Sequence, residues 1–293
     1  YNLFPQSEKE NRDLRGVKNI QSTFGYQIIK EWLASKSMQP FAFQEETWQH
    51  IFDGKSGLVN APTGCGKTFS VFLGAVIDFI NNHPEDYKIR SKNHLQLIWI
   101  TPLRALAKDI GRAMEEVVAE LGMSWKIGIR NGDTDLNERA KQKRQMPEVL
   151  IITPESLHLV LAQKGYPDLF KSLHIIAVDE WHELLGSKRG VQVELALSRI
   201  VGSRGSGVGS QAPAHPGDGL EITKTPLSIW GISATIGNLE EANEVLMAPL
   251  SSQKNFKPQL VKALLKKEVK VESVIPDEIE KYPWAGHLGI KLV

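Results

Sequence analysis

The sequence predicts an α/β fold in which helices cover both faces of a mainly parallel sheet. Two observations predict it. Short apolar runs typical of buried strands recur along the chain, and a longer stretch with apolar residues at helical spacing follows each run. Six such strand-then-helix units occur in series, which is typical of a mainly parallel sheet covered by helices on both faces. In folds of this kind, ligands bind at the carboxyl ends of the strands.

The expected elements follow the chain in order. Before the repeating units, residues 24–34 and 43–53 carry apolar positions at helical spacing. Strands are then expected at 57–61, 95–101, 125–130, 148–152, 174–178 and 227–232. The helices that follow them are expected at about 67–81, 103–121, 135–144, 154–163, 190–201 and 239–246.

The domain organisation is predicted from where this alternation holds and where it lapses. Residues 1–22 are expected to form a polar N-terminal arm, and residues 23–248 the α/β domain. Within the domain, the Gly-, Ser- and Pro-rich residues 201–219 predict a flexible surface insertion, most simply a solvated loop. Residues 249–293, where the alternation stops, are expected to connect to a further domain that this chain does not contain.

Composition narrows the class of protein. The 293 residues are 41% hydrophobic and 24% charged, as in an ordinary globular protein. Cys65 is the single cysteine, so an internal disulfide cannot form, and we interpret it as a tolerated small residue rather than a nucleophile. With a net charge of +1, nucleic acid would have to be contacted through a local patch. No apolar run approaches the ~18 residues of a membrane span, and no signal peptide opens the chain, so we expect a cytoplasmic protein.

A phosphate-binding loop motif, Ala-Pro-Thr-Gly-Cys-Gly-Lys-Thr, occupies residues 61–68 between a strand-like run and a strongly apolar helix. In this context, N–H groups of the loop and of the helix N-terminus point at phosphate oxygens, and the helix dipole favours anions. The alternative, a Gly-rich turn before a buried helix, is disfavoured by the strand, loop and GKT string together. The residues expected to contact the nucleotide are Thr63, Gly64, Cys65, Gly66, Lys67 and Thr68.

Within the loop, different residues have different expected roles. Gly64 and Gly66 permit backbone angles and a close approach that a side chain would block. Lys67 would reach the β- and γ-phosphates of ATP, and Thr68 would ligand Mg²⁺. Ala61 stands where the general motif has a glycine.

An Asp-Glu pair directly follows the apolar run 174–178. A buried parallel strand would deliver both carboxylates to the sheet edge that carries the phosphate loop. Because adjacent strand residues point to opposite sides, Asp179 would hold magnesium, and Glu180 would orient and deprotonate the water that attacks the γ-phosphate. His182 is counted among the residues of the nucleotide site, where it could relay contacts to a neighbouring loop. It has no partners at the spacing that a metal site would need. An acid-rich helix N-terminus is the alternative for an isolated Asp-Glu pair.

Together with these two strings, four further sequence features resemble the motifs of superfamily 2 helicases of the DEAH/DExH kind. They are Gln44 for the Q motif, TPLRAL at 101–106 for motif Ia, TPE at 153–155 for motif Ib and SAT at 233–235 for motif III. More narrowly, the strings at 130–134, 179–200, 230–238 and 282–289 resemble large helicase-related, Lhr-type proteins, and most of all the bacterial ligase-associated DEXH-box helicases. The resemblance implies a RecA-like P-loop NTPase domain whose second RecA-like partner domain is absent.

The two Thr-Pro dipeptides, at 101–102 and 153–154, are expected to begin helices, with Thr as the N-cap and Pro as the first helical residue. Helix N-termini present free N–H groups, across which the phosphates of a single strand could lie. The resemblance implies nucleic-acid contacts from Arg104, Gly132 and Thr153. Such contacts do not depend on base sequence, which suits a motor that moves along a strand.

The resemblance also implies a base-reading role and a coupling role. The carboxamide of Gln44 matches the N6/N7 edge of adenine, and Phe41 or Phe43 could stack on the base or belong to the core. Ser233 and Thr235 would hydrogen-bond toward Asp179 or His182. These bonds would link the state of the γ-phosphate to the nucleic-acid surface.

We therefore expect an ATP- and Mg²⁺-dependent DNA helicase that moves 3′-to-5′ along single-stranded DNA in DNA repair. A Ski2-like RNA helicase and a nucleotide-gated nucleic-acid-binding fragment with little turnover are the alternatives. A DNA ligase and a nuclease are expected partners from family context alone. The family's second domain supplies an arginine worth about 10³–10⁵ in rate, so the isolated chain is expected to be weakly active.

Overall fold

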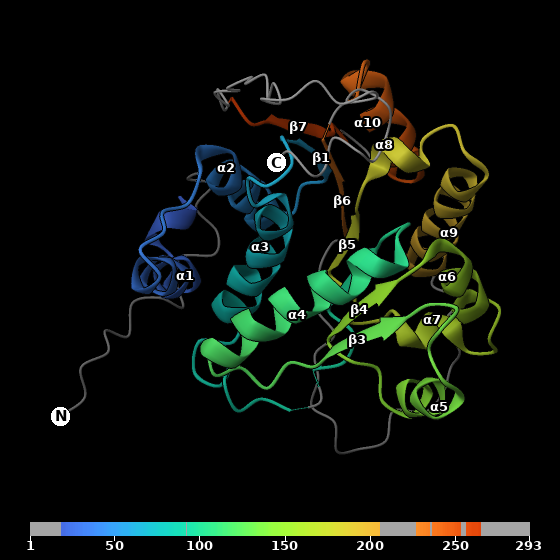
Figure 1. Ribbon diagram of the computed structural model, residues 1–293, viewed down its shortest axis with the longest axis horizontal. Coiled ribbons are helices and arrows are strands. Elements are labelled where there is room, and N and C mark those ends of the chain that lie inside the picture. The colour runs from blue at the N-terminus through green and yellow to red at the C-terminus, as the bar shows by residue number, and fades with distance from the viewer. Residues whose placement is uncertain (1–18, 92, 206–226, 235, 253–255, 265–293) are drawn as a thin grey trace, which may run out of the picture.

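Seven parallel strands form the centre of the computed structural model, which describes residues 19–91, 93–205, 227–234, 236–252 and 256–264 (Figure 1). The order across the sheet is β3-β4-β2-β5-β6-β1-β7. The strands are β1 Gly57–Asn60, β2 Leu97–Ile100, β3 Ile127–Arg130, β4 Val149–Ile152, β5 Ile175–Val178, β6 Ser228–Ser233 and β7 Gln259–Lys262. The predicted α/β class and parallel sheet are therefore confirmed.

Helices precede and connect the strands. They are η1 Ile20–Ser22, α1 Phe24–Ser35, α2 Ala42–Phe52, α3 Lys67–Asn82, α4 Arg104–Glu120, α5 Leu136–Arg144, α6 Pro154–Leu161, α7 Tyr166–Leu169, α8 Trp181–Leu184, α9 Lys188–Gly205, α10 Leu239–Met247 and η2 Ala248–Leu250. The short helices α7 and α8 were not predicted, because four residues carry too little periodicity to be recognised. No helix among the described residues has the length and apolarity that a membrane span requires.

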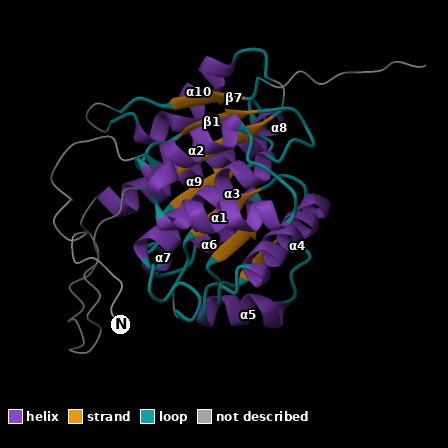
Figure 2. Ribbon diagram, turned by 90° about the vertical axis from the view of Figure 1, so that its left-hand side faces the viewer, coloured by secondary structure: helices purple, strands orange, loops and turns teal. Residues whose placement is uncertain are grey.

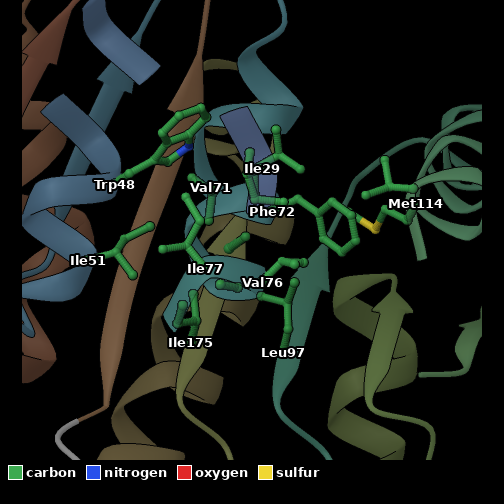
Figure 3. Close-up of a cluster of buried hydrophobic side chains, with 14 of the residues drawn as sticks. Ile29, Trp48, Ile51, Val71, Phe72, Val76, Ile77, Leu97, Met114 and Ile175 are labelled. Atoms are coloured by element: carbon green, nitrogen blue, oxygen red, sulfur yellow. The ribbon is translucent and has the colours of Figure 1, made fainter. Parts of the chain in front are cut away.

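Helices cover both faces of the sheet, and Figure 2 shows the face that lies behind α1, α2, α3 and α4. In the inner strands β2, β4 and β5, which are buried along their whole length, alternate residues belong to different cores. In β2, Leu97 and Trp99 pack with α1, α2, α3 and α4, whereas Ile98 and Ile100 pack with α6, α8, α9 and α10. Figure 3 shows part of the first core, in which side chains of α1, α2 and α3 meet Leu97 and Met114. The two helical layers fix the sheet, so the loops at the carboxyl ends of its strands are held by a rigid support.

Several predicted boundaries differ from the structure. The sheet extends to β7, so the predicted connection 249–293 begins with η2 and a sheet strand. Helix α9 continues through the first five residues of the predicted insertion 201–219. The predicted arm 1–22 ends in η1, where Ile20 is buried and its N–H donates to Gln49 Oε1 at 2.8 Å. Residues 1–18, 206–219, 253–255 and 265–293 of these segments lie outside the described residues.

One predicted helix start is correct and the other is wrong. Helix α6 begins at Pro154 with Thr153 as its N-cap, as expected. Helix α4 begins at Arg104 with Leu103 as N-cap, so Pro102 lies before the helix rather than at its first position. The buried Thr101 accepts a long, 3.5 Å hydrogen bond from Leu103 N in the turn between β2 and α4.

Candidate active site

The carboxyl ends of three neighbouring strands bring the predicted phosphate loop and the carboxylate pair to one edge of the sheet. Strand β6 lies between β1 and β5, pairing Asn60 with Ser233 and Val178 with Gly231. The loop follows β1, and Asp179 follows β5, so a single intervening strand separates them. This juxtaposition was predicted from the strand-like runs that precede each motif.

The phosphate loop has the backbone that a phosphate cradle requires. Gly64 and Gly66 have φ values of 79° and 77°, in the left-handed region that favours glycine. A Cβ atom on Gly64 would meet nothing within 4 Å, whereas one on Gly66 would lie 2.8 Å from Gln44 Nε2. Gly66 is also the N-cap of α3 and, having no side chain, does not cap that helix itself. The N–H of Phe69 donates to Gly66 O at 3.1 Å, and those of Lys67 and Thr68, at the start of this 16-residue helix, point to where an anion would bind.

Lys67 supplies the clearest sign that an anion belongs here. Its side chain is 9% exposed, and its Nζ atom is buried without a hydrogen-bond partner among the described residues. A buried ammonium without acceptors is unfavourable, so this group fits a ligand that brings negatively charged oxygens. Phosphate groups of ATP carry such oxygens, and the arrangement of loop, helix N-terminus and lysine suits them.

Asp179 is positioned by hydrogen bonds from both of its neighbours. Trp99 Nε1 donates to Oδ2 at 3.2 Å, and the backbone N–H of Glu180 donates to Oδ1 at 2.9 Å. Burial, followed by the nearby charge of Glu180, raises the pKa of Asp179 to about 6, and these two hydrogen bonds and Lys67 oppose the shift. A buried carboxylate beside the phosphate loop fits the expected magnesium ligand, since a cation would stabilise its charged form.

The raised pKa of Asp179 leads to a pH prediction. Mg²⁺ competes with the proton that Asp179 takes up below pH 6, so Mg²⁺-dependent nucleotide affinity should fall by up to about tenfold per pH unit there. Calorimetric titration of the chain and of Asp179→Asn at matched pH measures this. Protonation of the nucleotide affects both proteins equally, so it cancels in the ratio of the affinity of the unsubstituted chain to that of Asp179→Asn. A ratio that stays constant from pH 7 to pH 5 would contradict the prediction.

Glu180, His182 and Ser233 form a contact chain beside Asp179. Glu180 has a φ of 48°, an uncommon left-handed conformation for a residue with a side chain, at the N-cap of α8. His182 Nδ1 lies 3.4 Å from Glu180 Oε2 and 3.1 Å from Ser233 Oγ. The structure thus places Ser233 against His182, in the arrangement expected for a coupling role. Thr235, the other residue expected to have this role, lies outside the described residues.

Gln44 lies against the phosphate loop, but its carboxamide is already engaged. Its Nε2 donates to Gly66 O at 3.0 Å, and its Oε1 accepts from Phe41 N at 2.9 Å. Each of these atoms has one further bonding position, so base reading by Gln44 stays a prediction. Phe43 is buried in the core, whereas Phe41 is 42% exposed and stacks on it. Of these two aromatic side chains, Phe41 is therefore the one that a nucleobase could reach.

Two of the three predicted nucleic-acid contacts lie side by side. Arg104 Nη1 pairs with Asp133 Oδ1 at 2.9 Å, and both side chains are exposed. A Cβ atom on Gly132 would lie 2.7 Å from Arg104 Nη2, so the absence of a side chain allows this approach. Thr153 differs, because its side chain is buried and its hydroxyl donates to Ser156 Oγ at 3.1 Å. The N-terminus of α6 already carries a carboxylate, because Glu155 accepts from its own backbone N–H, so a phosphate contact of Thr153 stays a prediction.

Residues missed in the sequence also lie at this edge. Arg130 ends β3 in a buried position, and its Nη1 has no partner among the described residues. Burial, followed by the neighbouring Arg139, lowers the pKa of Arg130. Arg139 itself donates to the backbone oxygens of Asn131 and Gly132 at 3.0 and 3.2 Å. An arginine at the end of a predicted strand, on the edge that carries the other motifs, is the signal that could have revealed this group.

Comparison with known proteins places this site in context. The DEAD/DEAH box helicase family model matches residues 41–242. The Lhr helicase/uracil glycosylase of Escherichia coli (strain K12) is 34% identical over 182 residues, which is 58% of this chain and 12% of that protein. The ATP-dependent helicase Lhr-Core of Sulfolobus acidocaldarius is 30% identical over 279 residues, which is 93% of this chain and 29% of that protein. The chain therefore spans less than a third of either relative.

Solved structures give the same fold. The structure of the Mycobacterium smegmatis helicase Lhr bound to ssDNA and AMP-PNP matches with a TM-score of 0.61 and 28% identity, over 80% of this chain and 27% of that one. The DEAD-box helicase Mss116 bound to ssRNA and UDP-BeF matches with a TM-score of 0.58 and 19% identity, over 85% of this chain and 44% of that one, a likeness of fold alone. The predicted RecA-like helicase fold and the Lhr-type resemblance are confirmed, whereas the ligase-associated branch stays a prediction.

Proposed function

Because this chain belongs to the DEAD/DEAH box helicase family, we propose that it is the ATP-binding motor domain of a helicase that moves on single-stranded nucleic acid. The observation that carries the proposal is the buried Lys67 ammonium, which lacks a hydrogen-bond partner among the described residues and lies between the N-terminus of α3 and the carboxylate pair after β5. A site with these groups has donors for phosphate oxygens, a carboxylate for a cation and a second carboxylate for a water molecule.

The proposed roles divide among the residues at the edge. Lys67 and the loop N–H groups would bind the phosphates, while Thr68 and Asp179 would hold Mg²⁺, which neutralises phosphate charge when it is bound. Glu180 would orient the attacking water and accept its proton. His182 Nδ1 and Ser233 Oγ lie 3.1 Å apart, and this contact would couple the nucleotide state of the site to the end of β6.

We propose single-stranded DNA as the nucleic acid, with RNA as the second candidate. Arg104 and Arg130 lie at the carboxyl ends of β2 and β3, on the same edge of the sheet as the ATP site. These groups suit backbone phosphates and give no contact that distinguishes one base from another. The Mycobacterium smegmatis relative is bound to ssDNA, which supports DNA. A role in DNA repair, and a DNA ligase or nuclease as a partner, belong to the same proposal.

Strand separation tests the proposal. The protein that contains these 293 residues should unwind a DNA duplex with a 3′ single-stranded tail in the presence of ATP and Mg²⁺. A 5′-tailed duplex of the same base sequence is the matched substrate, and it should remain paired. Equal unwinding from both tails would refute the polarity. Unwinding of an RNA duplex with no action on DNA would favour the RNA helicase, and no unwinding of either would contradict a helicase.

A further inference from the structure

Asn60 joins three strand ends at the active-site edge. It is the last residue of β1, directly before the phosphate loop, and in register it stands between Ser233 of β6 and Lys262 of β7. Its backbone oxygen accepts from Ala263 N at 2.9 Å. Its side-chain Nδ2 donates to Ala234 O, at 2.6 Å, in the turn that follows β6.

The contacts continue from this turn to the carboxylate pair. The N–H of Ala61, the first residue of the phosphate loop, donates to Ser233 O at 3.1 Å. Ser233 Oγ lies 3.1 Å from His182 Nδ1, and the same nitrogen lies 3.4 Å from Glu180 Oε2. The base of the phosphate loop is therefore linked to Glu180 through the turn after β6.

The residue type at position 60 has a physical reason. The preceding residues of β1 are fully enclosed, and an apolar residue would continue that pattern. An asparagine instead supplies an N–H donor that reaches a backbone carbonyl 174 residues away in the chain. Without that donor, Ala234 O would lose this hydrogen bond, and the turn would be held by the backbone contact of Ser233 with Ala61.

We propose that Asn60 is a positioning residue, which holds the Ser233–Ala234 turn against the base of the phosphate loop and thereby couples the nucleotide site to nucleic-acid stimulation of hydrolysis. This inference rests on the proposed function. Asn60 itself contacts strand ends and loop backbone in the structure, so its expected effect is on coupling rather than on nucleotide affinity.

The test is the stimulation ratio, defined as the ATPase rate with saturating single-stranded DNA divided by the rate without it. Asn60→Leu keeps the branched shape of the side chain, with the same number of heavy atoms, and removes the donor. In the protein that contains this chain, it should lower the ratio by about tenfold while KM for ATP stays unchanged. Asn60→Gln, which retains a carboxamide, should restore part of the ratio. Since both rates scale with the amount of folded protein, a simple loss of folded protein leaves the ratio unchanged.

A matched control is Asn243 of α10, which contacts the opposite, amino-terminal end of the sheet. Asn243 Nδ2 also donates to a backbone carbonyl, that of Gln259, at 3.0 Å, where β7 begins. Asn243→Leu should keep the full stimulation ratio. A normal ratio in Asn60→Leu, or in Asn60→Ala if the leucine variant does not fold, would overturn the inference and leave the proposed function standing. The absence of any stimulation in the unsubstituted protein would instead overturn the proposed function, and this inference with it.

Discussion

Substitution Glu180→Gln is expected to preserve ATP binding and to lower ATP hydrolysis by about 10²–10⁴-fold, the usual contribution of a positioned general base. The glutamine keeps the shape of the side chain and removes the basic carboxylate that lies 3.4 Å from His182 Nδ1. Nucleotide affinity should be retained because Lys67 and the loop remain in place. Calorimetric titration with ATP, together with single-turnover hydrolysis, separates the two effects.

Glu183→Gln is the matched control for this substitution. Glu183 lies three residues further along, is 64% exposed and contacts the other ring nitrogen of His182 at 3.5 Å. Its amide variant should hydrolyse ATP at the unsubstituted rate. If both variants lost hydrolysis activity equally, the rate would depend on negative charge near His182 rather than on a base at position 180. Full activity in Glu180→Gln would remove the proposed base altogether.

Lys67→Met is expected to weaken nucleotide binding by about 10- to 150-fold, because hydrogen bonds to a charged group contribute about 1.5–3 kcal/mol. Methionine keeps most of the side-chain packing and removes the buried ammonium. The same change should raise the thermal unfolding midpoint of the nucleotide-free chain, since it removes a buried donor for which the described residues supply no acceptor. Fluorescence titration and differential scanning calorimetry measure the two effects.

The opposite signs of these two effects distinguish a functional lysine from a structural one. The exposed Lys108 of α4 is the control, and Lys108→Met should change neither quantity. If Lys67→Met lowered the unfolding midpoint and bound nucleotide normally, Lys67 would be a structural residue of α3 and the proposed phosphate contact would be wrong.

Much of the sheet could be predicted because most of its strands have a recognisable local sequence pattern. Each of the six expected strands is a short apolar run followed by a helix, and residues after β1 and β5 carry motifs whose position at one edge follows from parallel topology. Strand β7 was missed because Gln259–Lys262 is a short, half-polar run, and its place beside β1 depends on pairing with a distant part of the chain.

The side-chain contacts of the site were harder to predict than its residues. Gln44, Lys67, Asp179 and Glu180 were identified from their motifs, yet the left-handed backbone of Glu180 follows from the turn into α8. The bonds of Gln44 to Gly66 and of Asn60 to Ala234 join residues far apart in sequence. Such hydrogen bonds depend on tertiary packing, so they cannot be predicted from local patterns of residue type.

If one sheet edge carries an ATP site that is linked to a nucleic-acid surface, ATP turnover should depend on the concentration of single-stranded DNA. With the protein that contains this chain, at saturating ATP and Mg²⁺, we expect the rate to rise with an oligonucleotide of thymidines to a plateau at least about tenfold above the basal rate. We also expect this rise to disappear in Glu180→Gln. A rate that stays flat with both DNA and RNA oligonucleotides would contradict the account.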